Sequence, residues 1–186
     1  MANPEHTPEL DGFDRFTVSL YRMGIFGSSI AVLWLMATLT GDTQSLPAVL
    51  LLDASIALCA LNMHLYDKHV RWFIATTASL GLLLQLFSQL AAADSALSHL
   101  LVHAGLGFVF VAQSGFAMKE QFCFRIPGLR LTPIFLAVAV FAMFGGKPLI
   151  AVPFLALAGG LGGVLAIAKV RMPLHFDIGD KSRYQI

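Results

Sequence analysis

The sequence predicts an all-α, polytopic membrane protein built as a six-transmembrane-helix bundle. Of its 186 residues, 57% are hydrophobic and only 12% are charged, whereas ordinary soluble domains carry about 25% charged residues. The mean hydropathy is +0.76. A membrane-spanning helix needs about 20 apolar residues, so this chain can hold six spans with short loops and leaves no room for a separate soluble domain.

We expect three parts: an N-terminal tail over 1–15, a transmembrane domain over 16–168 and a C-terminal tail over 169–186. A secretory signal peptide begins with a basic segment that an apolar core follows directly. The first fifteen residues instead contain one basic residue, Arg15, so we expect the first helix to be retained. The acidic residues of this tail are Glu5, Glu9, Asp11 and Asp14.

The first three helices are separated by the polar connections TGDTQSL and DKH. The first contains Arg22, whose long side chain near the helix start can reach the headgroups while its stem stays in lipid. The second carries Asp53 well inside, and the third has Gln85 and Gln89 in its last turns. The three predicted helices are 16–39, 47–66 and 70–90.

The stretch 113–133 separates the fourth and fifth helices, and it is read as a helix end, a cationic turn and a helix start. Thr132 and Pro133 predict an N-cap and a first helical residue, because proline loses nothing where the N–H is unpaired. The fifth helix is short for a bilayer, and Pro153 should perturb the first turns of the sixth. The three predicted helices are 97–118, 133–144 and 148–168.

Orientation follows from lysine and arginine, which set topology when loops are short. Eleven of the twelve basic residues fall on one side of the six-helix arrangement, and Lys147 alone falls on the other. This count predicts a protein of the bacterial inner membrane with both termini in the cytoplasm. The net charge of +1 argues against a nucleic-acid partner. The eleven are Arg15, Arg22, Lys68, Arg71, Lys119, Arg125, Arg130, Lys169, Arg171, Lys181 and Arg183.

The first candidate site lies toward the outer side, where Asp53, His99 and His103 reach a similar depth. The two histidines are four residues apart and share a helix face, and Gln85 and Gln89 approach the same level. A carboxylate inside a membrane is costly and usually has a partner. The trio predicts a static hydrogen-bonded plug, a site for a transition metal or haem, or a proton or solute site.

The second candidate site lies at the cytoplasmic face and includes His64, Glu120 and Cys123. The plain interpretation is a collar of solvated ion pairs at helix ends. The alternatives are that these three residues bind a metal, or that Cys123 is a thiolate whose pKa is lowered by Lys119 and Arg125. With no pairing pattern, Cys59 and Cys123 are expected to be reduced.

Two short motifs carry a resemblance to a known family. They are HLYDK at 64–68 and KEQFCFR at 119–125, the second followed by PGL at 127–129. Over about 61–133 the chain resembles the DUF2301 family of bacterial integral membrane proteins. This resemblance implies a polytopic inner-membrane protein and assigns no activity to any residue.

The leading functional hypothesis is a non-enzymatic accessory or assembly subunit that packs against a larger membrane complex and holds a lipid or a cofactor. The partners to expect are the lipid bilayer and either such a complex or, in place of it, a homo-oligomer. The second is a small transporter or metal-handling protein that uses the outer aspartate and histidines. The third is a membrane redox protein that binds haem or quinone. Enzyme is the least supported class, because the sequence has no paired-carboxylate site, no nucleophile with an ordered base and no HExxH motif.

Overall fold

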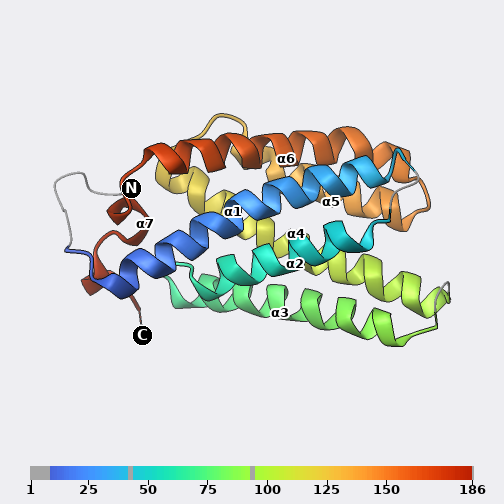
Figure 1. Ribbon diagram of the computed structural model, residues 1–186, viewed down its shortest axis with the longest axis horizontal. Helices are drawn as coiled ribbons and strands as arrows, with labels where there is room; N and C mark the ends of the chain where they lie inside the picture. Colours follow the sequence, from blue (N-terminus) through green and yellow to red (C-terminus); the bar gives the residue numbers. More distant parts are fainter. Residues whose placement is uncertain (1–8, 42–43, 93–94, 186) are drawn as a thin grey trace.

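The computed structural model describes residues 9–41, 44–92 and 95–185, and within these ranges all regular structure is helical. Six of these helices are longer than ten residues, and they run alternately in opposite directions (Figure 1). The all-α prediction is therefore confirmed. The elements are α1 (Gly12–Thr38), α2 (Leu46–Leu61), α3 (Lys68–Leu90), α4 (Ala96–Phe124), η1 (Leu129–Leu131), α5 (Thr132–Phe144), α6 (Pro148–Arg171), α7 (His175–Ile178) and η2 (Lys181–Arg183).

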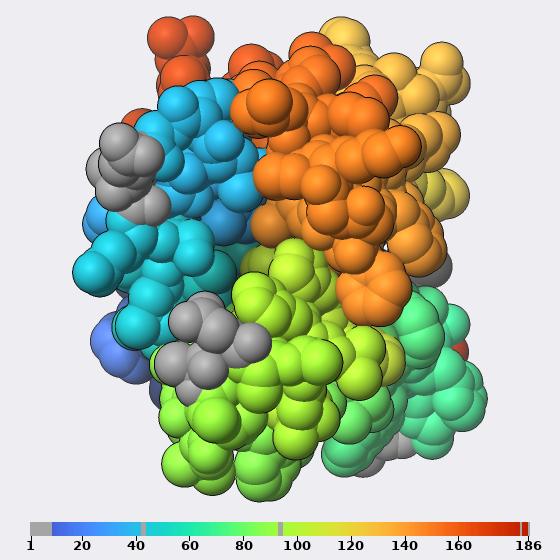
Figure 2. All heavy atoms as spheres, turned by 90° about the vertical axis from the view of Figure 1, so that its right-hand side faces the viewer, coloured from blue at the N-terminus to red at the C-terminus, as the bar shows by residue number. Residues whose placement is uncertain are grey.

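The six helices form a closed ring. Each packs against the next one in sequence, and α6 packs back against α1. The start of α1, the α2–α3 and α4–α5 connections and α7 lie together at one end of the bundle (Figure 1), which we call the basic end. Figure 2 looks onto the opposite end, where α1 ends, α4 begins and α5 gives way to α6.

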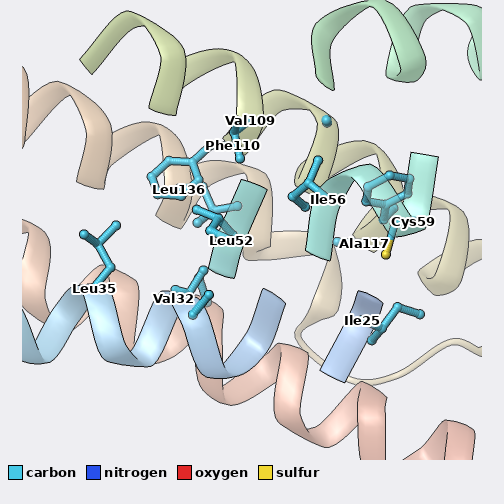
Figure 3. Packing of buried hydrophobic residues seen from close by; sticks show 14 of the residues in the cluster. Ile25, Val32, Leu35, Leu52, Ile56, Cys59, Val109, Phe110, Ala117 and Leu136 are labelled. Atoms are coloured by element: carbon cyan, nitrogen blue, oxygen red, sulfur yellow. The ribbon is translucent and has the colours of Figure 1, made fainter. Parts of the chain in front are cut away.

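One continuous hydrophobic core fills the ring and draws on all six helices. Leu52 of α2, Phe110 of α4 and Leu136 of α5 lie close together in Figure 3, while Val32 and Leu35 point toward them from α1. Burial of these apolar side chains gives no advantage over lipid, so tight packing and hydrogen bonds between helices have to hold the bundle together.

Small residues provide that tight packing at two helix crossings. A Cβ atom on Gly24 of α1 would lie 2.7 Å from the backbone oxygen of Ser55 in α2. A Cβ atom on Gly105 of α4 would lie 3.0 Å from the backbone oxygen of Gly81 in α3. Only glycine allows these backbones to approach so closely.

Large apolar side chains also cover the outside of the bundle, as expected for a surface that faces lipid. However, only four of the described helices are long and apolar enough to cross a membrane, namely α1, α3, α4 and α6. The expected six spans are borne out for these four helices alone, because α2 has 16 residues and α5 has 13. At 1.5 Å per residue these helices are about 24 and 20 Å long, against a hydrocarbon core of about 30 Å.

Helix α2 is short because it ends earlier than predicted. The sequence predicted a helix to residue 66, but the last helical residue is Leu61. The Asn62 side chain donates a hydrogen bond to the Leu58 carbonyl at 2.9 Å and closes the helix. Asp67 then starts α3 by accepting hydrogen bonds from the backbone N–H groups of His69 and Val70.

Helix α4 is longer than predicted, and this changes the basic end. It continues to Phe124 rather than ending at residue 118, and Arg125 adopts the left-handed conformation that ends it. Residues 119–124, read in the sequence as a cationic turn, are therefore helical. Similarly, α1 begins at Gly12 inside the predicted tail, because Asp11 and Asp14 form a reciprocal capping box.

The predicted N-cap at Thr132 is also wrong. The 3-10 helix η1 leads directly into α5, so Thr132 has helical dihedral angles instead of the extended ones of an N-cap. Its hydroxyl is buried and has no hydrogen-bond partner among the described residues. Pro153 lies inside α6, which continues on both sides of it.

Candidate functional site

The most concentrated polar chemistry of the described chain is a buried ion cluster at the basic end. Its centre is Glu120, whose residue surface is 0% exposed. The Tyr21 hydroxyl donates to Glu120 Oε1 at 2.6 Å, and Lys119 Nζ donates to the same oxygen at 3.0 Å. Lys169 Nζ lies 2.6 Å from Oε2. The ion cluster, as used below, consists of Tyr21, Arg22, Lys119, Glu120, Lys169 and Asp177.

Asp177 brings the C-terminal segment into this cluster. Its carboxylate accepts a hydrogen bond from Arg22 Nε at 2.7 Å and also pairs with Lys169. The Arg22 Nη1 group donates to the carbonyls of Lys169 at 2.6 Å and Met172 at 2.8 Å. Arg22 therefore bonds to carbonyls at the end of α6, where backbone partners are few, and it ties α1 to both α6 and α7.

Three cations surround two carboxylates in the cluster, and each carboxylate contacts two of the cations. Such pairing offsets the cost of removing charges from water, and removal of one partner leaves an uncompensated charge. Aromatic rings add to the cationic contacts, since Lys119 Nζ lies 4.3 Å from the Tyr21 ring centroid. The arrangement joins α1, α4, α6 and α7 at a single point.

This group differs from the collar of solvated ion pairs predicted from the sequence, because Glu120 and Lys169 are fully buried. Tyr21, Lys169 and Asp177 were missed, because each lies more than 45 residues from Glu120 in the chain. One signal was present: Lys169 and Arg22 both fall close to an apolar segment, where a charge needs a partner.

His64 and Cys123 lie beside the cluster at a small cavity of about 70 Å³, which Lys119 and Asp177 also line. No three His, Cys, Asp or Glu side chains within the described ranges are grouped as metal ligands, so the assignment of His64, Glu120 and Cys123 to a metal stays a prediction. Cys59 and Cys123 are both free thiols.

His64 is held neutral by its surroundings. The Thr17 hydroxyl donates to the Asp14 carbonyl, so it accepts a hydrogen bond from His64 Nε2 at 3.1 Å. Burial lowers the pKa of His64 below its ordinary value, and the nearby Lys119 ammonium acts in the same direction. The Tyr184 ring stacks on the imidazole at 6.2 Å between centroids, which docks the C-terminal segment here.

The outer candidate site is only partly assembled. Gln85 Nε2 donates a hydrogen bond to Asp53 Oδ1 at 3.2 Å, and both residues are buried. The His99 and His103 rings stack on each other with centroids 6.5 Å apart. Gln89 donates to the Ser88 hydroxyl instead of joining Asp53.

The Asp53 contact resembles the static plug, one of the three interpretations of the outer site. Since no metal-ligand group of three is found in the part of the chain that the structure describes, the assignment of Asp53, His99 and His103 to a metal or haem stays a prediction. Metal analysis and an absorption spectrum of the purified protein would test it.

A feature that the sequence analysis did not find is an apolar groove between α4 and α5, which has a volume of about 400 Å³. His103 and Ser114 are its polar lining residues, and Gly107 lies between them along α4. His103 Nδ1 donates to the His99 carbonyl at 2.7 Å, because a carbonyl only accepts. In a neutral His103 ring, Nε2 is therefore the hydrogen-bond acceptor.

A profile of the DUF2301 family, described as an uncharacterized integral membrane protein, matches residues 56–186. The chain belongs to the DUF2301 family. An uncharacterized protein of Haemophilus influenzae is 36% identical to it over 186 residues, which is 100% of both chains. No solved structure matches the chain.

The DUF2301 match confirms the resemblance that the two short motifs predicted and makes this an integral membrane protein. The matched region contains four charged residues of the ion cluster, namely Lys119, Glu120, Lys169 and Asp177. Tyr21 and Arg22 come from α1, which precedes it. The groove between α4 and α5 lies wholly inside the matched region.

Proposed function

We propose that this DUF2301 protein is a non-enzymatic accessory or assembly subunit of the membrane that holds a phospholipid in the groove between α4 and α5. The observation that carries the proposal is the groove itself. Its volume of about 400 Å³ lies in the range of small-molecule sites, about 300–1,000 Å³, and its lining is almost entirely apolar. Because the helices lie in a bilayer, lipid is the most abundant apolar molecule beside this groove.

The length of the groove suits an acyl chain. Between His103 and Ser114, α4 rises about 16 Å at 1.5 Å per residue. The aromatic side chains of Phe108, Phe141 and Phe144 also line it. An acyl chain bound in this groove would exchange its contacts with other lipid chains for closer contacts with the protein.

Charge at the opposite end of the bundle favours an anionic headgroup. Lys147 is the basic residue that breaks the positive-inside pattern, and it follows Phe144 at the end of α5. Its side chain is exposed. A basic residue beside a groove between helices is suited to an anionic lipid headgroup, and His103 offers a second polar contact at the same end.

The same proposal includes a topology. We infer that α2 and α5 also cross the bilayer, which would have to thin locally or accept tilted neighbours around them. The basic end would then face the cytoplasm of a bacterial inner membrane, with both termini inside. The alternation of helix directions and the distribution of lysine and arginine support this arrangement.

The lipid site can be tested by filling the groove. A Cβ atom on Gly107 would have its nearest neighbour, Val140 Cγ2, at 3.9 Å, so Gly107→Leu extends into the groove without a backbone clash. We expect wild-type protein extracted in mild detergent to carry phospholipid by native mass spectrometry, and Gly107→Leu to lose it.

The matched control is Gly160→Leu, because a Cβ atom there meets nothing within 4 Å and the residue is exposed on α6. This variant should retain the lipid. Equal lipid content in the two variants, or none in the wild type, would contradict the site. The subunit role would be lost separately if the protein always migrates from native membranes as a lone protomer or a homo-oligomer.

A further inference from the structure

A small cavity, mainly apolar but lined also by Ser28, Gln113 and Thr132, lies inside the bundle, apart from the groove and the ion cluster. It has a volume of about 30 Å³ and is lined by residues of α1, α2, η1, α4, α5 and α6. Two of its lining residues carry a side-chain oxygen, Gln113 Oε1 and Thr132 Oγ1, that is buried without a hydrogen-bond partner among the described residues. Gln113 is 7% exposed and Thr132 is 3% exposed.

Two unpaired polar atoms beside one cavity are costly in a dry interior. A buried polar group without a hydrogen bond loses about 1–3 kcal/mol, and in the membrane no bulk water reaches it. The cost disappears if a water molecule bonds to both atoms. We propose that this cavity is an internal hydration site that binds about one or two water molecules between Gln113, Thr132 and Ser28.

The size and the chemistry of the cavity fit this ligand. A buried water needs about 10–15 Å³ of accessible space and two to four polar partners. Gln113 Oε1 accepts a hydrogen bond, and the Thr132 hydroxyl donates or accepts one. The Ser28 hydroxyl donates to the Ile25 carbonyl at 3.0 Å, which leaves its own oxygen free to accept. Water can therefore find three partners.

The cavity lies directly inward of the ion cluster. Gln113, Ser28 and Gly162 are each seven residues from a cluster residue on the same helix, namely Glu120, Tyr21 and Lys169. Seven residues are two helical turns, or about 10 Å. Phe116 separates the two sites, with its ring against Tyr21 at 6.3 Å between centroids. Bound water would thus extend the polar chemistry of the basic end into the middle of the bundle.

Solid-state NMR of isotope-labelled protein in bilayers tests the proposal directly. Magnetisation transferred from water should reach the Gln113 and Thr132 side chains at short mixing times. Thr77 is the matched buried control, because its hydroxyl donates to the carbonyls of Phe73 and Ile74. Its side chain should receive no magnetisation from water at these mixing times. If the Gln113 and Thr132 side chains receive no magnetisation from water while the exposed Gln185 does, the cavity is dry and the inference fails.

A second measurement uses the sign of a stability change. Thr132→Val keeps the side-chain shape and removes the hydroxyl. If water bonds to that hydroxyl, the thermal midpoint should fall by about 2–4 °C, the shift that one lost hydrogen bond causes in a chain of this size. If the hydroxyl is unpaired, its removal should leave the midpoint unchanged or raise it, which would overturn the proposal. Thr77→Val calibrates the exchange of threonine for valine.

Discussion

At the scale of single residues, Glu120 is the side chain on which the basic end depends. It contacts Tyr21, Lys119 and Lys169 and has no exposed surface. Glu120→Gln keeps the shape of the side chain but removes the negative charge that pairs with Lys119 and Lys169. We expect a loss of about 3–5 kcal/mol in unfolding free energy, the usual cost of breaking a buried ion pair, measured by thermal or denaturant unfolding in detergent.

The double variant Lys119→Met with Glu120→Gln provides the control for this residue. It removes one cation together with the carboxylate, so less uncompensated charge stays buried than in Glu120→Gln alone. The double variant should therefore be the more stable of the two. A single variant as stable as the wild type would mean that the ion cluster contributes nothing to holding α1, α4 and α6 together.

At the scale of the elements, the C-terminal segment is held by a neutral histidine. His64 bonds to Thr17 and stacks on Tyr184, and burial lowers its pKa from 6.5. A lowered pKa means that folded protein resists protonation, so this contribution is complete above pH 6.5 and is lost as the pH falls through the folded value. The thermal midpoint should decline on acidification, and it should decline less in His64→Gln. Parallel pH profiles for the two proteins would contradict this role.

Element boundaries also show what the sequence can and cannot predict. Six helical segments were predictable from apolar runs. In the structure Asp67 is the N-cap of α3 and Arg125 is the C-cap of α4. The length of α4 was missed because Lys119 and Glu120 were taken for a solvated turn, although no glycine or proline lies between Lys119 and Pro127. Their burial depends on Tyr21 and Lys169, which only the folded ring brings together. The groove likewise arises from the fit of α4 against α5, which no local pattern encodes.

At the scale of the whole molecule, the proposed topology fixes how many times the chain crosses the bilayer. Four helices satisfy the length criterion, and α2 and α5 lie beside them in the ring. If all six cross, the connections after Leu61 and Phe124 share one side with the C-terminus. Because successive helices run in opposite directions, the proposed six crossings keep all residues of the ion cluster on one side of the membrane.

Fusions provide the measurement. With the basic end in the cytoplasm, green fluorescent protein attached after the last residue should fluoresce, and alkaline phosphatase there should be inactive. Phosphatase inserted after Gly146, at the α5–α6 turn, should be active, because this turn would face the periplasm. Single-cysteine labelling in intact cells, with Lys147→Cys against Arg125→Cys in a chain lacking Cys59 and Cys123, should give the same assignment. Labelling of both positions from outside would contradict the six-span arrangement.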